Sequence, residues 1–567
     1  MSFIVRFYFI LALLISPYIY GQKSYEITFS ATDHHFFVKK PKQFFKDSLS
    51  AMNYISDVQH KAISKGYILA SVDSIQYYNK NAVVYFYTGD KFGEISLNIT
   101  PDDLSFLRKN STVSEKLIAH IPFTPNSYAA ILNKVQNAFL ENGYPFVSIG
   151  LKKTILNDKN IEADLEIIRG PYVTWTRINV KGDSSISVKY ISNLLNIRKG
   201  EVYRESEPKK ISNRIKQVPF LEEIKSSELL FTKKGAELFV YLKSIPISSI
   251  NGIIGFQPNP LSGKLTVTGE LDLKLQNVLK RGELLNIKWR SIQAQTQSLD
   301  AHFNYPFLFN TSFGIDATFQ LYKRDTSFLE LNSSIGIDYY LKKGAVLKVF
   351  YQNISSSVLS GGLNNPTYSS LGNSRSNNYG IAFTSKQLDY IPNPSKGYVI
   401  SMKTSAGSRK SQINDTTLEI KSLTFRGEAI LEYYLPLAKR HVLRFSNRTE
   451  YYSAPEIFQN ELYRFGGLNE QRGFNEDELL STTKNTTTIE YRYLLDQNSH
   501  VFAFYDQSWY ENISNGYFND SPYGFGAGFS FSTNFGVFSI SYALGKQFSN
   551  PIQFSNSKIH FGYIVYF

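Results

Sequence analysis

The sequence predicts α+β repeats followed by a 16-stranded antiparallel transmembrane β-barrel. Three observations support this fold class. A motif around Gly66 recurs around Gly143, each time ahead of a segment that alternates apolar and polar residues. From about residue 249 such alternation continues through segment after segment, as in strands with two different faces. No window offers about 18 uninterrupted apolar residues, so strands rather than helices would have to cross a membrane.

The composition excludes several classes of protein. Of the 567 residues, 42% are hydrophobic, 15% aromatic and only 19% charged, which fits neither a disordered chain nor a helical membrane protein. The chain has no cysteine, which excludes a disulfide scaffold, thiolate metal sites and a cysteine nucleophile. The net charge of +13 is compatible with nucleic acid, an anionic membrane surface or a basic lumen, and charge alone does not choose among them.

Residues 1–21 have the features of a secretory signal peptide. Arg6 precedes a short apolar run that ends before Pro17, and the small residue Gly21 follows. The run is shorter than the about 20 residues of a membrane-spanning helix, so a retained anchor is the less favoured alternative. Because export removes the chain from the cytoplasm, it argues against a nucleic-acid partner for the positive charge.

Residues 24–246 contain a repeated module. Gly66 and Gly143 lie in matching Gly-Tyr motifs, and a looser third copy ends in a strand pattern at 236–242. Helical patterns precede these signals, for example from Tyr128 to Leu140. Each unit therefore predicts the order strand, helix, helix, strand, strand, and the units are expected to lie end to end.

This order and period resemble the POTRA domain, a small periplasmic module found in front of outer-membrane assembly barrels. A generic α+β repeat is the alternative. The resemblance implies a signal peptide at 1–21, POTRA-like modules at 22–91, 92–170 and 171–246, and an outer-membrane barrel at 247–567. The exposed sheet edge of such a module can accept an extended peptide by β-augmentation, which would suit a receptor for many unfolded clients.

The second half of the chain contains sixteen candidate strands. They cover roughly 249–257, 264–277, 283–296, 298–306, 310–323, 327–341, 343–354, 377–388, 397–408, 419–435, 439–452, 484–494, 499–510, 522–532, 535–546 and 557–567. Connections after even-numbered strands are mostly tight, whereas the long ones, 355–376 and 453–483, follow odd-numbered strands. Short turns at one end and long loops at the other are typical of an outer-membrane barrel with periplasmic termini, and a soluble all-β domain is less favoured.

An even number of strands allows the first and last strands to meet antiparallel. The last candidate strand carries an outward apolar and aromatic row of Ile559, Phe561, Tyr563, Val565 and Phe567. The first carries Gly252 and Gly255, and glycine removes side-chain packing from a strand. We therefore expect a weak lateral seam where 250–256 meet 558–567.

The loop after the eleventh candidate strand resembles the sixth extracellular loop of the BamA/TamA family. It contains Phe465-Gly-Gly-Leu-Asn-Glu-Gln-Arg-Gly-Phe474, and the segments 489–493 and 501–506 resemble the two strands that follow it in the family. The resemblance spans nearly the whole mature chain. Three modules make the chain closer in size to TamA than to the five-module BamA.

The resemblance also implies how this loop is held. Its tip, Arg472-Gly473-Phe474, would fold back into the lumen, with Arg472 facing an acidic patch of Asp506 and Glu490. A guanidinium offers five donors that match carboxylate oxygens, and the glycine allows a close turn. An exposed surface arginine is the alternative. The family usually has glycine where this chain has Ser508, which leaves the local packing open.

No catalytic constellation is evident in the sequence. His34 and His35 would point apart in a strand, and the other histidines lack ligand spacing. The segment 524–528 lacks the strand, turn and helix context of a nucleotide-binding fingerprint, and small residues on one strand face explain it. There is no Gly-x-Ser-x-Gly elbow or Walker loop. We therefore expect no enzyme activity, no metal and no other cofactor.

The resemblance implies an assembly factor in the outer membrane of a Gram-negative bacterium, with its modules in the periplasm. It would receive unfolded outer-membrane protein clients and insert them into the outer-membrane lipid through the lateral seam. Periplasmic or lipoprotein accessory subunits are further candidate partners, and nucleic acid is not expected. A two-partner-type polypeptide secretion pore of the same superfamily is the runner-up, and a passive porin is less favoured because porins do not need such modules.

Overall fold

A computed structural model describes residues 25–31, 43–78, 81–157, 159–183, 185–258, 265–291, 296–341, 344–363, 370–391, 393–412, 419–533 and 536–566. The predicted signal peptide, His34, His35 and Phe567 lie outside these residues. The chain forms two compact units. The first comprises Met1–Thr174 with Val202–Ser206, and the second comprises Trp175–Glu201 with Glu207–Phe567.

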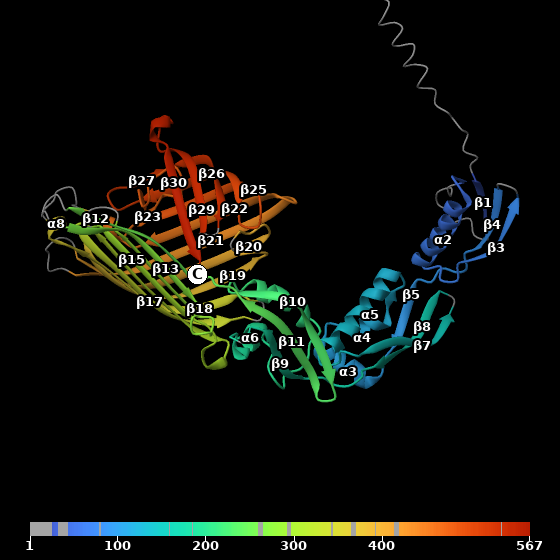
Figure 1. The fold of residues 1–567 in the computed structure, drawn as a ribbon. Helices are drawn as coiled ribbons and strands as arrows, with labels where there is room; N and C mark the ends of the chain where they lie inside the picture. Colours follow the sequence, from blue (N-terminus) through green and yellow to red (C-terminus); the bar gives the residue numbers. More distant parts are fainter. Residues whose placement is uncertain are drawn as a thin grey trace, which may run out of the picture. The chain divides into compact units, whose positions relative to one another are not determined.

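Three small α+β sheets precede the barrel and share one topology (Figure 1). The first contains β1 (Tyr25–Ala31), β2 (Phe44–Phe45), α2 (Ser48–Ser64), β3 (Ser71–Tyr78) and β4 (Asn81–Tyr87). The second contains β5 (Glu94–Asn98), α3 (Pro101–Asn110), α4 (Glu115–Ala119), β6 (Ile121–Pro122), α5 (Pro125–Leu140), β7 (Ser148–Asn157) and β8 (Asn160–Ile168). The third contains β9 (Trp175–Gly182), α6 (Val188–Leu195), η1 (Pro208–Lys210), α7 (Ile211–Lys216), β10 (Leu221–Thr232) and β11 (Gly235–Ser244). In each sheet the first strand pairs parallel with the last, and the last pairs antiparallel with the strand before it.

Helix α5 illustrates how the sequence specifies these elements. The hydroxyl of Thr124 accepts a hydrogen bond from the backbone N–H of Ser127 at 3.1 Å, which caps the helix. Ile131, Val135 and Phe139 recur every four residues, so they share one face and are buried in the core against the sheet. The helical pattern predicted at 128–140 is therefore the main part of α5.

The two Gly-Tyr motifs have a common conformational cause. Gly66 and Gly143 have φ values of +101° and +92°, a left-handed region that favours glycine. Each glycine carbonyl accepts a hydrogen bond from the segment leading to the next sheet, from Phe92 N at 2.9 Å and from Val173 N at 2.8 Å. The repeated glycine therefore marks the junction between successive sheets.

The second half forms a closed antiparallel barrel of sixteen long strands and the three-residue strand β27 (Phe518–Asp520) (Figure 1). The long strands are β12 (Ser249–Pro258), β13 (Leu265–Gln276), β14 (Leu284–Ser291), β15 (Gln297–Tyr305), β16 (Phe313–Arg324), β17 (Phe328–Tyr340), β18 (Val346–Val358), β19 (Asn373–Leu388), β20 (Gly397–Gln412), β21 (Ile420–Ala438), β22 (His441–Ser453), β25 (Thr483–Leu494), β26 (His500–Asn512), β28 (Tyr523–Thr533), β29 (Gly536–Lys546) and β30 (Lys558–Tyr566). Short helical turns η2 (Leu308–Asn310), α8 (Ser360–Leu363) and η5 (Phe554–Asn556) lie in connections. The predicted fold class is therefore confirmed, and the connection expected at 355–376 is shorter because β18 and β19 extend into it.

The barrel strands present apolar side chains outward and polar ones inward. On β17, Ile335 and Ile337 are exposed, whereas Asp338, the next residue along the strand, points to the other face and is buried. On β19, Tyr379 and Ile381 are likewise exposed. Because this pattern reverses that of a water-soluble core, the barrel has the surface of an outer-membrane barrel.

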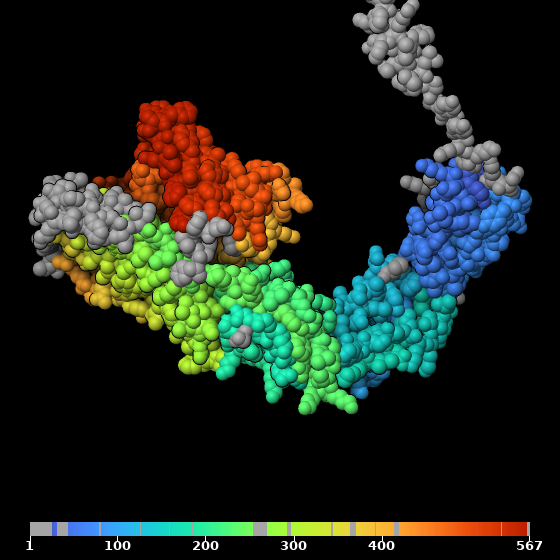
Figure 2. Space-filling model, viewed as in Figure 1, coloured from blue at the N-terminus to red at the C-terminus, as the bar shows by residue number. Residues whose placement is uncertain are grey.

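The third sheet is docked onto one end of the barrel within the second unit (Figure 2). The ring of Tyr190 on α6 lies 5.6 Å from that of Phe307 in the β15–β16 turn, and it leaves room only for a glycine at Gly282. The side-chain amide of Gln217 donates to the carbonyl of Leu388 at 2.8 Å and accepts from its N–H at 3.3 Å. The third sheet therefore binds the turns after β13, β15 and β19.

Candidate functional site

The connection between β22 and β25 folds into the barrel. It contains η4 (Gln459–Glu461), β23 (Tyr463–Phe465) and β24 (Leu479–Ser481), and β23 pairs antiparallel with β24. Phe465, Phe474 and Leu479 form a buried cluster with Tyr510 of β26. This small core fixes both arms of the loop against the wall, so the intervening tip has a defined place.

Arg472 at the tip is bound by the two acidic residues that the resemblance implied. It is 7% exposed, and Asp506 on β26 is fully buried. Its Nε and Nη2 donate to the two oxygens of Asp506, both at 2.7 Å, and Nη1 donates to Oε2 of Glu490 on β25 at 2.5 Å. This bidentate geometry uses the planar fork of the guanidinium, which a lysine would not reproduce.

The surroundings of the Arg472 ion pairs strengthen them. The guanidinium carbon lies 3.5 Å from the ring centre of Phe504, a cation–π contact. The Thr488 hydroxyl donates to Asp506 at 2.8 Å. Burial would lower the pKa of Arg472, but the two carboxylates outweigh burial and raise that pKa above its ordinary value. The side chain therefore stays charged at every physiological pH.

The tip backbone lies so close to the wall that only glycines fit opposite it. A Cβ at Gly524 on β28 would overlap the carbonyl oxygen of Arg472. A Cβ at Gly473, whose φ is +95°, would lie 2.7 Å from the backbone nitrogen of Gly545 on β29. Gly524 belongs to the small-residue segment 524–528, whose glycines the sequence signalled without indicating what would approach them. Sequence reasoning missed this role of Gly524 and Gly545.

Ser508, where the chain departs from the family pattern, binds the loop directly. Its hydroxyl donates to Oε1 of Gln471 at 2.5 Å and lies 2.7 Å from the hydroxyl of Thr486. The amide nitrogen of Gln471 donates in turn to the carbonyl of Asp506 at 3.3 Å. Ser508 therefore adds a hydrogen bond to the anchor, and sequence reasoning also missed Gln471.

The first and last barrel strands meet over a very short ladder. In the described part of the chain, β12 and β30 share two residue pairs, Ser249 with Tyr566 and Ile250 with Val565. The side-chain amide of Asn251 also donates to the carbonyl of Tyr563. Within the described residues, no further pair joins these two strands.

This seam differs from the contact expected between 250–256 and 558–567. Gly252 and Gly255 pair with Leu271 and Thr268 of β13, and neither pairs with β30. Of the expected outward row, Ile559 and Phe561 are 73% and 58% exposed. Tyr563 is partly exposed, and the side chains of Val565 and Phe567 lie outside the described atoms.

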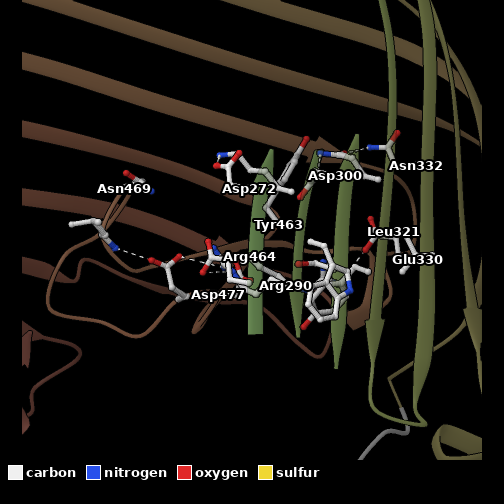
Figure 3. A pocket seen from close by; sticks show the side chains of 18 of the residues that line it. Asp272, Arg290, Asp300, Leu321, Glu330, Asn332, Tyr463, Arg464, Asn469 and Asp477 are labelled. Carbon is white, nitrogen blue, oxygen red and sulfur yellow. Dashed lines mark hydrogen bonds and ion pairs between the residues drawn. The ribbon is translucent and has the colours of Figure 1, made fainter. Parts of the chain in front are cut away.

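A polar cavity of about 1150 Å³ lies between the loop and the barrel wall (Figure 3). Tyr463, Arg464, Asn469 and Asp477 of the loop face it from one side. From the wall it is lined by charged and polar residues including Asp272, Arg290, Asp300, Glu330 and Asn332. Asn251, Gly252 and residues 559–563 line it as well, so the cavity reaches the seam.

Among the described residues, no helix is long and apolar enough to cross a membrane. No group of three or more histidine, aspartate or glutamate side chains in those segments is arranged to hold a metal ion.

Comparisons with known proteins identify similar folds. No protein-family model matches the sequence, and no curated protein matches it. Among solved structures, CdiB from Acinetobacter baumannii is 13% identical with a TM-score of 0.54, covering 84% of this chain and 90% of that one. CdiB from Escherichia coli is 12% identical with a TM-score of 0.53, covering 91% and 97%. BamA from Haemophilus ducreyi lacking POTRA domains 1–3 is 12% identical with a TM-score of 0.42, covering 84% and 99%. The chain therefore has the fold of the two CdiB structures.

Proposed function

We propose that this protein inserts client β-barrels into the outer membrane through the seam between β12 and β30. The observation that carries this proposal is the two-pair ladder at the seam, next to a cavity that opens onto it. A strand edge outside a ladder is a template for pairing with another chain. A client strand could therefore pair with β12 or β30 and enter the lipid from there.

The energetics of this reaction require no cofactor. A client barrel buries its apolar face in lipid and satisfies its backbone hydrogen bonds as it closes, so its own folding supplies the free energy. The protein has to lower the barrier by offering an edge in register at the membrane. We infer a non-enzymatic role for this reason.

The same proposal places the chain in the outer membrane of a Gram-negative bacterium. Residues 1–21 would direct export, and POTRA-like modules at 22–91, 92–170 and 171–246 would bind unfolded clients in the periplasm. The outward apolar surface of the barrel would contact outer-membrane lipid. Periplasmic or lipoprotein accessory subunits are candidate partners, and nucleic acid is not one.

A secretion pore of the two-partner type is the second candidate. The likeness to the fold of CdiB favours it, as does the polar lining of the lumen. In such a pore an extended polypeptide would cross the lumen rather than leave through the seam. The loop anchored by Arg472 would then have to move out of its way.

Depletion of the protein in its native cells tests the proposal and separates the two candidates. If it inserts clients, depletion should reduce many outer-membrane barrels, measured by quantitative proteomics of the isolated membrane. In a second experiment, purified protein in liposomes should convert urea-denatured client barrels to their heat-modifiable folded form. Liposomes that contain an unrelated porin are the control and should not do so. Loss of a single surface polypeptide with all barrels unchanged would reject insertion and favour the secretion pore.

A further inference from the structure

The loop between β22 and β25 meets the barrel at a second place, ahead of Arg472 in the chain. Glu461 of η4 is 6% exposed, and Arg409 on β20 is 1% exposed. Nε and Nη2 of Arg409 donate to the two oxygens of Glu461 at 2.9 and 2.7 Å. The same carboxylate accepts the backbone N–H of Phe458 at 3.0 Å and the hydroxyl of Tyr452 at 3.1 Å. Four donors therefore converge on this one buried carboxylate.

The charge state of Glu461 fits this arrangement. Burial alone would raise its pKa, but the hydrogen bonds and positive charge of Arg409 outweigh burial and hold the pKa below its ordinary value. The pair is therefore ionised and compensated in the folded protein. Removing the charge of one partner alone would leave the other buried and uncompensated.

Asn460, the neighbour of Glu461, is fully buried, and both ends of its side-chain amide form hydrogen bonds. Its Nδ2 donates to the hydroxyl of Ser356 on β18 and to the carbonyl of Gly372, both at 2.8 Å. Its Oδ1 accepts the N–H of Gly372 at 3.1 Å. A Cβ at Gly372 would overlap the ring of Phe458, so the wall is shaped to the loop at this point. A surface turn would not need such complete satisfaction.

A third contact extends this attachment. Nη2 of Arg464 donates to Glu330 on β17 at 3.1 Å, and its guanidinium carbon lies 4.0 Å from the ring centre of Tyr322 on β16. The attachment thus involves β16, β17, β18 and β20. The Arg472 tip instead contacts β25, β26, β28, β29 and β30.

The two attachments have opposite polarity. At Arg472 the loop supplies the guanidinium and the wall the carboxylates, whereas at Glu461 the loop supplies the carboxylate and the wall the guanidinium. Each is accompanied by a buried loop amide bound to a wall serine, Gln471 with Ser508 and Asn460 with Ser356. Because each set of partners is complete in itself, neither attachment needs the other.

We propose that Asn460 and Glu461 are positioning residues that hold the loop across the end of the lumen opposite the third sheet, independently of the Arg472 anchor. Arg409 and Ser356 lie near the ends of β20 and β18 that are far from the docked turns. Glu461 lines the same large cavity as the loop residues beyond it. This attachment therefore separates the cavity from the outside. The inference rests on the barrel spanning the membrane as proposed, and not on the nature of the clients.

The absence of native cysteine allows a direct test with two matched reporters. Ser356→Cys and Ser508→Cys each place a thiol under one attachment, where both serines are buried. Glu461→Gln should make the reporter at Ser356 react several-fold faster with a membrane-impermeant maleimide, while the reporter at Ser508 stays protected. Arg472→Ala should do the reverse. Glu428→Gln is the control, because Glu428 is a lumen carboxylate whose hydrogen bond and ion pair are with Lys403 on the wall.

The same variants should differ in ion conductance across planar bilayers. Glu461→Gln should raise the conductance several-fold with heat-modifiability intact, and Glu428→Gln should not. If Glu461→Gln fails to fold, Asn460→Asp, which removes the two amide donors, makes the same test. Unchanged conductance, or exposure of both reporters together by either variant, would overturn the proposal. Client insertion is assayed in the same samples, so a failure of the proposed function appears as inactive wild-type protein and leaves the reporter result readable.

Discussion

Strand β12 has two edges, and the barrel holds them very differently. Ten residue pairs join it to β13, from Ser249–Lys274 to Pro258–Leu265, whereas two pairs join it to β30. A backbone hydrogen bond contributes about 0.5–1.5 kcal/mol net, so the second edge has a small fraction of the stabilisation of the first. Gly252 and Gly255 belong to both edges of β12, because each residue of a strand faces one neighbouring strand on either side. Their presence therefore does not explain the weakness, which follows from the small number of residue pairs between β12 and β30.

Strand β30 pairs with β29 over seven residues, and the loop tip also contacts it from inside the barrel. The backbone N–H of Gly473 at the loop tip donates to Nε2 of His560 on β30 at 3.4 Å. The tip also lies on Gly524 and Gly545 of the two preceding strands. Both sides of the seam are therefore held by a neighbouring strand, and the β30 side has a further contact with the anchored loop.

Locking the weak edge should have the largest effect. Ile250 and Val565 are a directly opposed pair, so Ile250→Cys with Val565→Cys falls within the Cα separation that a disulfide spans. Oxidation should abolish client insertion in liposomes, because the edge can no longer accept a client strand, and reduction should restore it.

The other edge of β12 supplies the control for this lock. Ile250→Cys with Leu273→Cys joins the same residue to β13, an edge that stays paired throughout the proposed cycle. This variant should insert clients equally well oxidised and reduced. A fully oxidised seam that still inserts clients at the wild-type rate would exclude lateral opening.

Loss of the loop anchor should have the next largest effect. Arg472→Ala leaves Asp506 as an uncompensated buried charge, a loss of about 3–5 kcal/mol, whereas Glu490 keeps its ion pair with Arg492. We expect the barrel to remain heat-modifiable while client insertion falls and crosslinking across the seam changes. Arg448→Ala is the control, since Arg448 also lines a cavity in the barrel but its ion pair with Glu470 of the loop is long, at 4.0 Å, with no bidentate geometry. Equal activity of the two variants would contradict an anchoring role.

A crowded tip should produce the smallest effect. Gly524→Ala forces the tip away from β28 and should cost about 1–3 kcal/mol, as overpacking does. Gly427→Ala, in β21, is the matched control because its Cβ would meet only an ordinary contact at 3.9 Å. The reporter at Ser508 should become labelled in the first variant and stay protected in the second. Protection in both would show that the tip tolerates a methyl group.

Sequence reasoning recovered the strands because alternation is a local property. Ile335, Ile337 and Tyr379 read as outward positions directly from their parity, and the strand ends were mostly within a few residues. The pairing of Arg472 with Asp506 came from the resemblance, since nothing local connects residues that far apart in the chain. The contact between Gln471 and Ser508 depends on how far the loop extends into the barrel, and so does the fit of Gly524 to the tip. The alternation of residues along a strand carries no information on that distance.

The register of the seam and the second attachment were not predicted, for a related reason. Gly252 and Gly255 led us to expect the seam at 250–256, but the register between the two ends of a barrel is set by its closure and not by either strand. Nothing in the sequence singles out Glu461, because its partner Arg409 lies 52 residues away on β20. Only folding brings the two charged side chains together in one buried site.

The amide of Gln217 has a practical consequence for cutting the chain. This side-chain amide forms hydrogen bonds with the backbone N–H and C=O of Leu388, as a neighbouring strand would, at the end of β19. A fragment starting at residue 247 would lack these hydrogen bonds and would expose the ring of Phe307 to solvent. It should therefore be prone to aggregate during refolding. A start at Trp175, where the second compact unit begins, keeps both covered. Chimeras that exchange the third sheet should therefore carry its matching turns with it.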